Sequence, residues 1–193
     1  EPAKSDLLTG ENINGRCCGR MEIGMNRIYF STDGVSAFNY QFEIRDENGN
    51  VRYIAKTVTE KMIGYPLRVW YPNGAEAFVV QTKKKLTMAS LHFEMVLPNG
   101  QHVTDILQKN KFVKYVYELP QYNMVADGDF ISHKFSINQG GKQIGFIDRK
   151  MMAWGDSFEI QFEDPAMEQL ILAATFAVEL ATIHQRHARN RRR

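Results

Sequence analysis

The sequence predicts a mainly β protein, with a closed antiparallel barrel of about twelve strands around a central hydrophobic C-terminal helix. Short segments that alternate apolar and polar residues recur along the chain, separated by turns with Asn-Gly or Gly-Gly. The chain then ends in an apolar run that a protein interior is expected to surround. With 193 residues, it is long enough to bury the core of one such domain.

Four predicted hairpins share one pattern. In the first, residues 42–45 and 51–54 alternate apolar and polar side chains on either side of an Asn-Gly turn. Asn-Gly suits a tight turn because both residues tolerate positive φ, and the alternation indicates a sheet with one buried face. The other three hairpins join 67–70 to 77–80, 93–96 to 102–104, and 135–137 to 144–147.

Further strands are predicted outside these hairpins. The pair Asp127-Gly128 indicates another turn, and residues 130–137 indicate the strand that follows it. One more strand is predicted near residues 21–25, within a segment that is otherwise rich in Gly, Asn and charge. Together these segments give the strand number expected for the barrel.

The last predicted element is a helix at about residues 165–187. Asp164 and Pro165 favour a helix start, because Asp caps free N–H groups and Pro at the first position loses no hydrogen bond. Residues 170–183 are largely apolar on every side, with Glu179 as the one charged residue. A bilayer span needs about 20 apolar residues, so we expect burial in protein. Hairpins wrapped around such a helix predict a barrel with the helix as its plug.

Three segments are expected: a loosely ordered leader at 1–26, the barrel with its helix at 27–187, and a basic tail at 188–193. The net charge of +2 conceals an asymmetry, since residues 186–193 carry five arginines and no acid. Without them, 19 basic residues face 22 acidic ones, which leaves the body at −3. This acidic body disfavours a globally basic nucleic-acid binder. The tail is interpreted as a solvated terminus, with phosphate or lipid contact as the alternative.

Five segments, with the helix last, carry a resemblance to a known family: 42–55, 128–137, 141–150, 154–162 and 170–184. Their order resembles the YxjI/LURP-one-related family of the tubby C-terminal-like superfamily, which also contains the phospholipid scramblases. That resemblance implies a twelve-stranded barrel around a hydrophobic C-terminal helix. It also implies two functional precedents: tubby proteins bind phosphoinositides and regulate transcription, and scramblases are linked to calcium and lipid movement.

Two departures from the scramblases bear on function. Their acidic segment before the closing helix is represented here by scattered acids without closely spaced Asp-x-Asp pairs, so a calcium site is not expected. Their cysteine clusters are missing apart from Cys17 and Cys18, which are interpreted as ordinary thiols, with palmitoylation as the alternative. Adjacent cysteines form no disulfide framework, and no signal peptide is recognisable, so we expect a cytoplasmic protein. The scattered acids are Asp156, Glu159, Glu163, Asp164 and Glu168.

A basic patch for anionic lipid or inositol phosphates is the main candidate site. The alternative interpretation of its lysines, which the sequence favours, is protection of strand edges and turns against aggregation. Two tail arginines, Arg189 and Arg191, extend the candidate lipid-binding set. The patch lysines are Lys83, Lys84, Lys85, Lys109, Lys111 and Lys114.

Glu179 is a buried acid on the central helix, and we expect it to be satisfied structurally by a barrel side chain or by backbone N–H groups. His184 and His187 share a helix face, but the neighbouring arginines disfavour a metal there, and the other histidines are scattered. No metal site, cofactor or catalytic constellation is therefore expected. Trp70 and Trp154 are interpreted as packing residues.

Three functional hypotheses follow. The first is a non-enzymatic domain that binds anionic phospholipid or phosphoinositide at a membrane surface, without a transmembrane segment. The second is a regulatory module that interacts with protein or, less favourably, with DNA. The third is a scramblase-like lipid-handling protein, which the plugged barrel disfavours.

Overall fold

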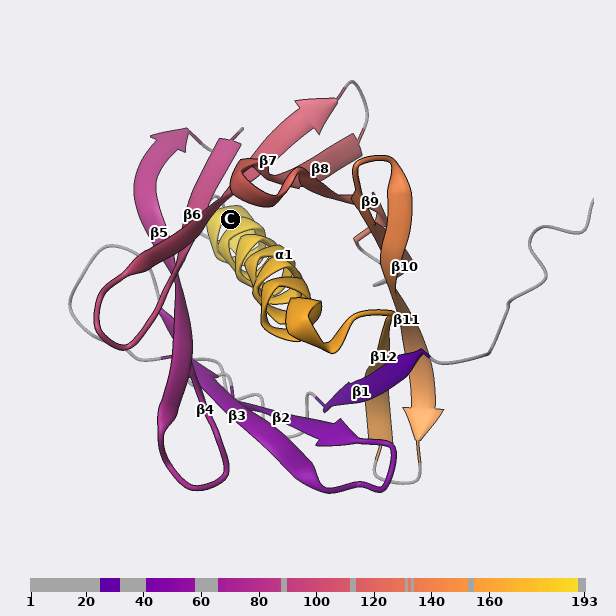
Figure 1. Cartoon of the computed structure of the whole chain (residues 1–193). Helices are drawn as coiled ribbons and strands as arrows, with labels where there is room; N and C mark the ends of the chain where they lie inside the picture. The colour runs from indigo at the N-terminus through magenta and orange to yellow at the C-terminus, as the bar shows by residue number, and fades with distance from the viewer. Residues whose placement is uncertain are drawn as a thin grey trace, which may run out of the picture.

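The computed structural model describes residues 25–31, 41–57, 66–87, 90–111, 114–130, 132, 134–152 and 155–190. Within them, twelve antiparallel strands form one closed barrel in chain order, and β1 pairs with both β2 and β12 (Figure 1). A short 3₁₀ helix at Pro120–Tyr122 follows β8. The strands are β1 Asn26–Ser31, β2 Gln41–Asp46, β3 Val51–Thr57, β4 Leu67–Trp70, β5 Glu76–Thr87, β6 Ser90–Val96, β7 His102–Lys111, β8 Lys114–Leu119, β9 Met124–Asp129, β10 Lys134–Gln139, β11 Lys142–Met152 and β12 Gly155–Phe162.

The predicted hairpin turns form as their chemistry requires. Between β2 and β3, the Asp46 carboxylate accepts hydrogen bonds from the backbone N–H groups of Asn48 and Asn50, both at 2.9 Å. Gly49 adopts a φ of +82°, which a glycine takes at little cost. In the β4–β5 and β6–β7 turns, Gly74 and Gly100 adopt similar φ angles of +83° and +81°. The four hairpins predicted from the sequence are confirmed.

The structure corrects one local prediction, and another concerns residues that the structure does not describe. The turn predicted at Asp127-Gly128 is wrong, because both residues lie inside β9, and β10 starts at Lys134 rather than at Phe130. Gly128 is needed there because the backbone of β10 approaches it too closely for a Cβ atom. The strand predicted near residues 21–25, like nearly all of the predicted leader, lies outside the described residues.

The helix α1 spans Glu168–Asn190 and lies inside the ring of strands (Figure 1). A 3₁₀ turn at Pro165–Met167 precedes it, and the Asp164 side chain accepts a hydrogen bond from the Ala166 N–H at 2.9 Å. The predicted plug is confirmed: Leu172 and Phe176 are fully buried, and Leu180 is 2% exposed. Among the described residues, no helix combines the length and the apolar character that a membrane crossing demands.

Candidate functional site

The lysines of the predicted patch lie toward one end of the barrel. β5 ends at Thr87 and β6 begins at Ser90, while β7 ends at Lys111 and β8 begins at Lys114. Because neighbouring strands are antiparallel, both connections lie at the same end of the barrel. We call this end, with the patch lysines on its strand ends, the basic end. Its lysines are Lys83, Lys84, Lys85, Lys109, Lys111 and Lys114.

The C-terminal part of α1 runs towards the basic end. β12 has the direction of β6 and β8, away from the basic end, so α1 starts at the opposite end and runs back. Burial raises the pKa of Tyr117 in β8, and the charge of Glu179 raises it further. From Glu179 to Asn190 the helix rises by about 16 Å. The backbone therefore carries Arg186 and Arg189 to the basic end.

Two lysines of the patch are engaged by carboxylates. Lys83 Nζ lies 3.0 Å from Asp105 Oδ1 and 3.5 Å from Glu94 Oε2. Lys109 Nζ lies 2.5 Å from Glu118 Oε2. Their charge is therefore partly neutralised at the barrel surface. The structure describes only the backbone of Lys84, Lys85, Lys111, Lys114 and Arg189, and Arg191 lies outside it.

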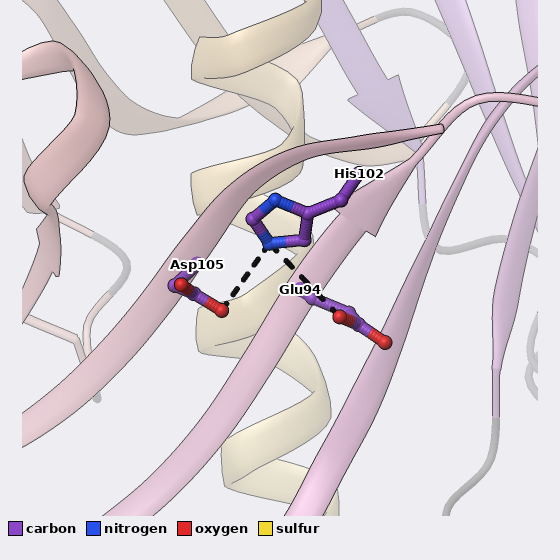
Figure 2. Close-up of side chains that lie close together, drawn as sticks. All are labelled: Glu94, His102 and Asp105. Atoms are coloured by element: carbon purple, nitrogen blue, oxygen red, sulfur yellow. Dashed lines mark hydrogen bonds and ion pairs between the residues drawn. The ribbon is translucent and has the colours of Figure 1, made fainter. Parts of the chain in front are cut away.

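A group of polar side chains lies on the outer face of β5, β6 and β7. In β6, His92 and Glu94 lie on either side of the buried Phe93, so both face outwards. Glu94 of β6 pairs directly with Asp105 of β7. Figure 2 shows Glu94, His102 and Asp105 converging from these two strands. We define the β6–β7 cluster as Lys83, His92, Glu94, His102 and Asp105.

Two β-bulges bring the β6–β7 cluster together. β5 pairs with β6 on both sides of Lys83, which is left as an extra residue. β7 pairs with β6 on both sides of Val103 in the same way. His102 and Asp105 are three residues apart and would lie on opposite faces of a regular strand. The bulge at Val103 turns His102 to the outer face, where it meets Asp105.

Asp105 is the centre of the β6–β7 cluster. Its Oδ1 lies 2.8 Å from His92 Nε2, 3.3 Å from His102 Nε2 and 3.0 Å from Lys83 Nζ. Its Oδ2 accepts a hydrogen bond from Gln121 Nε2 at 3.0 Å. Partial burial alone would raise the pKa of Asp105, but these hydrogen bonds outweigh it and hold the pKa well below its usual range. The carboxylate is therefore ionised throughout the physiological range.

Glu94 is held in a similar way. Gln81 Nε2 donates to Glu94 Oε1 at 2.9 Å, while Glu94 Oε2 lies 4.0 Å from His102 Nε2. One carboxylate oxygen each from Glu94 and Asp105 and one nitrogen of His102 thus lie within 4.8 Å of one another, an arrangement that can bind a cation. Sequence reasoning missed it because the bulge at Val103 has no local signature. The available signal was two histidines and two acids on adjacent strands of one predicted hairpin.

Glu179 lies in the middle of α1, the helix inside the ring of strands. It is half-buried rather than fully enclosed. Tyr117, whose pKa responds to its charge, accepts a hydrogen bond from Gln108 Nε2 at 3.0 Å. That a barrel side chain or backbone N–H groups satisfy Glu179 stays a prediction.

The acids that precede the closing helix are divided between separate surroundings. Glu159 is buried and lies 3.5 Å from the Tyr29 hydroxyl, which donates to it. Glu168 is also buried, and its Oε2 lies 3.2 Å from Arg52 Nη2. Glu163 and Asp164 are exposed. The side chain of Asp156 lies outside the part of the chain that the structure describes.

Tyr53 makes stability fall in alkaline solution. Burial, together with the charge of Glu168, raises the pKa of Tyr53 from 10.0 to about 12. Between these values the unfolded chain loses the proton and the folded chain keeps it, so folding becomes weaker as pH rises. We expect Tyr53→Phe, which cannot ionise, to remove about 2–3 kcal/mol of the loss between about pH 10 and 12. Urea unfolding at each pH measures this, and parallel pH profiles for the two proteins would contradict it.

Comparison with known proteins gives a solved structure of similar fold and a matching family. A solved structure of a protein from Arabidopsis thaliana is similar with a TM-score of 0.55 and 12% identity, covering 81% of this chain and 92% of that one. At that identity the likeness concerns the fold alone. The curated proteins give no match. The model of the LURP-one-related family matches residues 28–179, from β1 into α1. The chain is a tubby-like barrel closed around its own helix, and it belongs to the LURP-one-related family.

Proposed function

We propose that the protein is a non-enzymatic binding module whose basic end attaches peripherally to membranes rich in anionic phospholipid, phosphoinositides among them. The observation that carries this proposal is that basic residues from separate parts of the sequence meet at one end of the barrel. Two hairpins and the end of α1, which are far apart in sequence, bring the patch lysines together with Arg186 and Arg189. An excess of positive charge attracts anionic headgroups and orients the barrel towards them.

The opposite end of the barrel has a different charge balance. The turns there carry exposed or half-buried acids, and two of the basic residues among them are already paired. Arg45 is paired with Glu43, and Lys142 Nζ lies 2.6 Å from Glu163 Oε2. The barrel is therefore polarised along its axis, which supports approach to a membrane by the basic end. The acids of the opposite end include Asp46, Glu47, Glu76, Glu163 and Asp164.

Because Lys83 and Lys109 are already paired, binding depends mainly on the other cations of the basic end. Each Lys near an anionic surface contributes about 1 kcal/mol. We expect Lys84→Ala/Lys85→Ala to weaken binding to vesicles of phosphatidylcholine with phosphatidylserine by about 2 kcal/mol, roughly 30-fold. Co-sedimentation over a range of lipid concentrations measures the partition coefficient, which should also fall as salt rises.

A matched control removes two positive charges from the opposite end. Lys142→Ala/Arg45→Ala has the same change in net charge and should leave vesicle binding close to that of the original protein. Equal losses in both variants would mean that overall charge, not the basic end, controls binding. Equal binding to pure phosphatidylcholine vesicles would contradict the proposal outright. Tighter binding to duplex DNA than to vesicles would favour the regulatory alternative.

A further inference from the structure

We propose that the β6–β7 cluster is a site for one divalent transition-metal ion, with zinc as the best chemical fit. The proposed ligands are His92, Glu94, His102 and Asp105, and Lys83 competes with the ion for the two carboxylates. This inference does not rest on membrane binding. It also lies apart from His184 and His187, the pair considered from the sequence, because it uses histidines of the barrel wall.

The ligand atoms have the separation that a zinc ion requires. One donor atom each from Glu94, His102 and Asp105 lies within 4.8 Å of the others. His102 Nε2 is 3.3 Å from Asp105 Oδ1 and 4.0 Å from Glu94 Oε2 (Figure 2). Tetrahedral zinc, with bonds of about 2.0–2.1 Å to nitrogen and oxygen, places neighbouring ligand atoms about 3.4 Å apart. His92 Nε2 lies 2.8 Å from Asp105 Oδ1 but is not one of these three donors, so its ring must turn towards them to become the fourth ligand.

A second layer of side chains orients the carboxylates. Gln121 Nε2 donates to Asp105 Oδ2, and Gln121 Oε1 in turn accepts from Thr104 Oγ1 at 2.8 Å. Gln81 Nε2 donates to Glu94 Oε1. Each acid thus has one oxygen held by a glutamine amide and the other turned towards the histidines. Such outer partners fix the ligand geometry of metal sites, and their loss commonly weakens metal binding 10–100-fold.

The donor set and the charge balance both select the kind of ion. Two imidazole nitrogens with two carboxylate oxygens suit zinc and related transition metals, whereas calcium takes six to eight oxygens. Glu94 and Asp105 contribute two negative charges, and their side chains are only 15% and 20% exposed. Lys83 supplies one positive charge, so the cluster retains one negative charge with neutral histidines. A divalent ion in place of the lysine balances both carboxylates.

Lys83 can leave without disturbing the sheet. It is the extra residue of a bulge, and its side chain is 42% exposed, so its ammonium group can swing into water. Its Nζ lies 3.0 Å from Asp105 Oδ1 and 3.5 Å from Glu94 Oε2. The lysine charge therefore competes with the metal for the two carboxylates. Removing Lys83 should strengthen metal binding, whereas removing a structural salt bridge should not.

The experiment titrates the full chain with zinc chloride by calorimetry at pH 7.5. All proteins carry Cys17→Ser/Cys18→Ser, because adjacent thiols can bind zinc themselves. The expected result is one saturable ion per chain. We expect His102→Ala to weaken binding at least tenfold and Lys83→Met to strengthen it at least threefold. With cobalt(II), a tetrahedral visible spectrum should appear in the parent protein and be lost in His102→Ala.

Two comparisons decide the outcome. His184→Ala/His187→Ala should bind zinc like the parent, and loss of binding there but not in His102→Ala would place the ion at the C-terminus and overturn the proposal. No saturable binding, or equal affinity in the parent, His102→Ala and Lys83→Met, would also overturn it. Thermal unfolding without metal verifies that each variant is folded. Added zinc should then raise the melting temperature of the parent and of Lys83→Met, because the ion binds the folded state.

Discussion

Replacing Phe176 with alanine is expected to lower the free energy of unfolding by about 3–5 kcal/mol. Phe176 is fully buried in the middle of α1. Its ring centroid lies 5.7 Å from that of Phe30, 6.1 Å from that of Phe42 and 6.5 Å from that of Phe78. These partners belong to β1, β2 and β5, so one side chain joins the plug to three strands of the barrel. A closed barrel cannot collapse far into the space left behind, which puts the loss in the upper part of the range.

Urea unfolding of the full chain measures this loss. Tyr71→Ala is the matched control, because Tyr71 is an aromatic residue that is 36% exposed, and truncation there should cost about 1 kcal/mol or less. The urea dependence of the free energy should stay the same in both variants, since the surface exposed on unfolding changes little. A loss in Phe176→Ala no greater than in Tyr71→Ala would mean that α1 does not form the core.

The fold could be predicted because its signals are local. Asn-Gly and Gly-Gly turns between alternating segments locate hairpins, and antiparallel hairpins in sequence order build a barrel without long connections. The run at 170–183 then identifies the plug, because no polar face is available for solvent. The prediction that Leu172, Phe176 and Leu180 are buried came from that single observation, and the structure confirms it.

The candidate sites depend on the pairing register of neighbouring strands, which local sequence patterns do not determine. An extra residue at Lys83 or Val103 reverses the face of every side chain beyond it, and no single residue type marks these bulges. The sequence therefore gave no reason to place His102 beside Asp105. It also gave no indication that Lys83 and Lys109 of the predicted patch each have a carboxylate partner on a neighbouring strand. Cross-strand partners such as these appear only when the pairing is known.

Gly128→Ala is expected to lower the free energy of unfolding by about 4 kcal/mol, which makes it as damaging as the loss of a core aromatic. Asp-Gly usually indicates a turn, but Gly128 lies within β9 and pairs with Phe135 of β10. A Cβ atom there would lie 2.6 Å from the Lys134 carbonyl oxygen and 2.6 Å from Phe135 Cα. These are backbone atoms of a paired strand, so they cannot move aside without breaking the ladder. The φ of +154° adds strain, since it lies in a region that glycine alone occupies readily.

Gly141→Ala separates the two causes of this loss. Gly141 has a φ of +86°, but a Cβ atom there would meet nothing within 4 Å, so only backbone strain of about 1–2 kcal/mol is expected. Urea unfolding of both variants should therefore show a difference of about 2 kcal/mol or more, which measures the contact between β9 and β10. Equal losses would mean that β10 can move away from Gly128. In that case their close approach at Gly128 would not be what holds the two strands together.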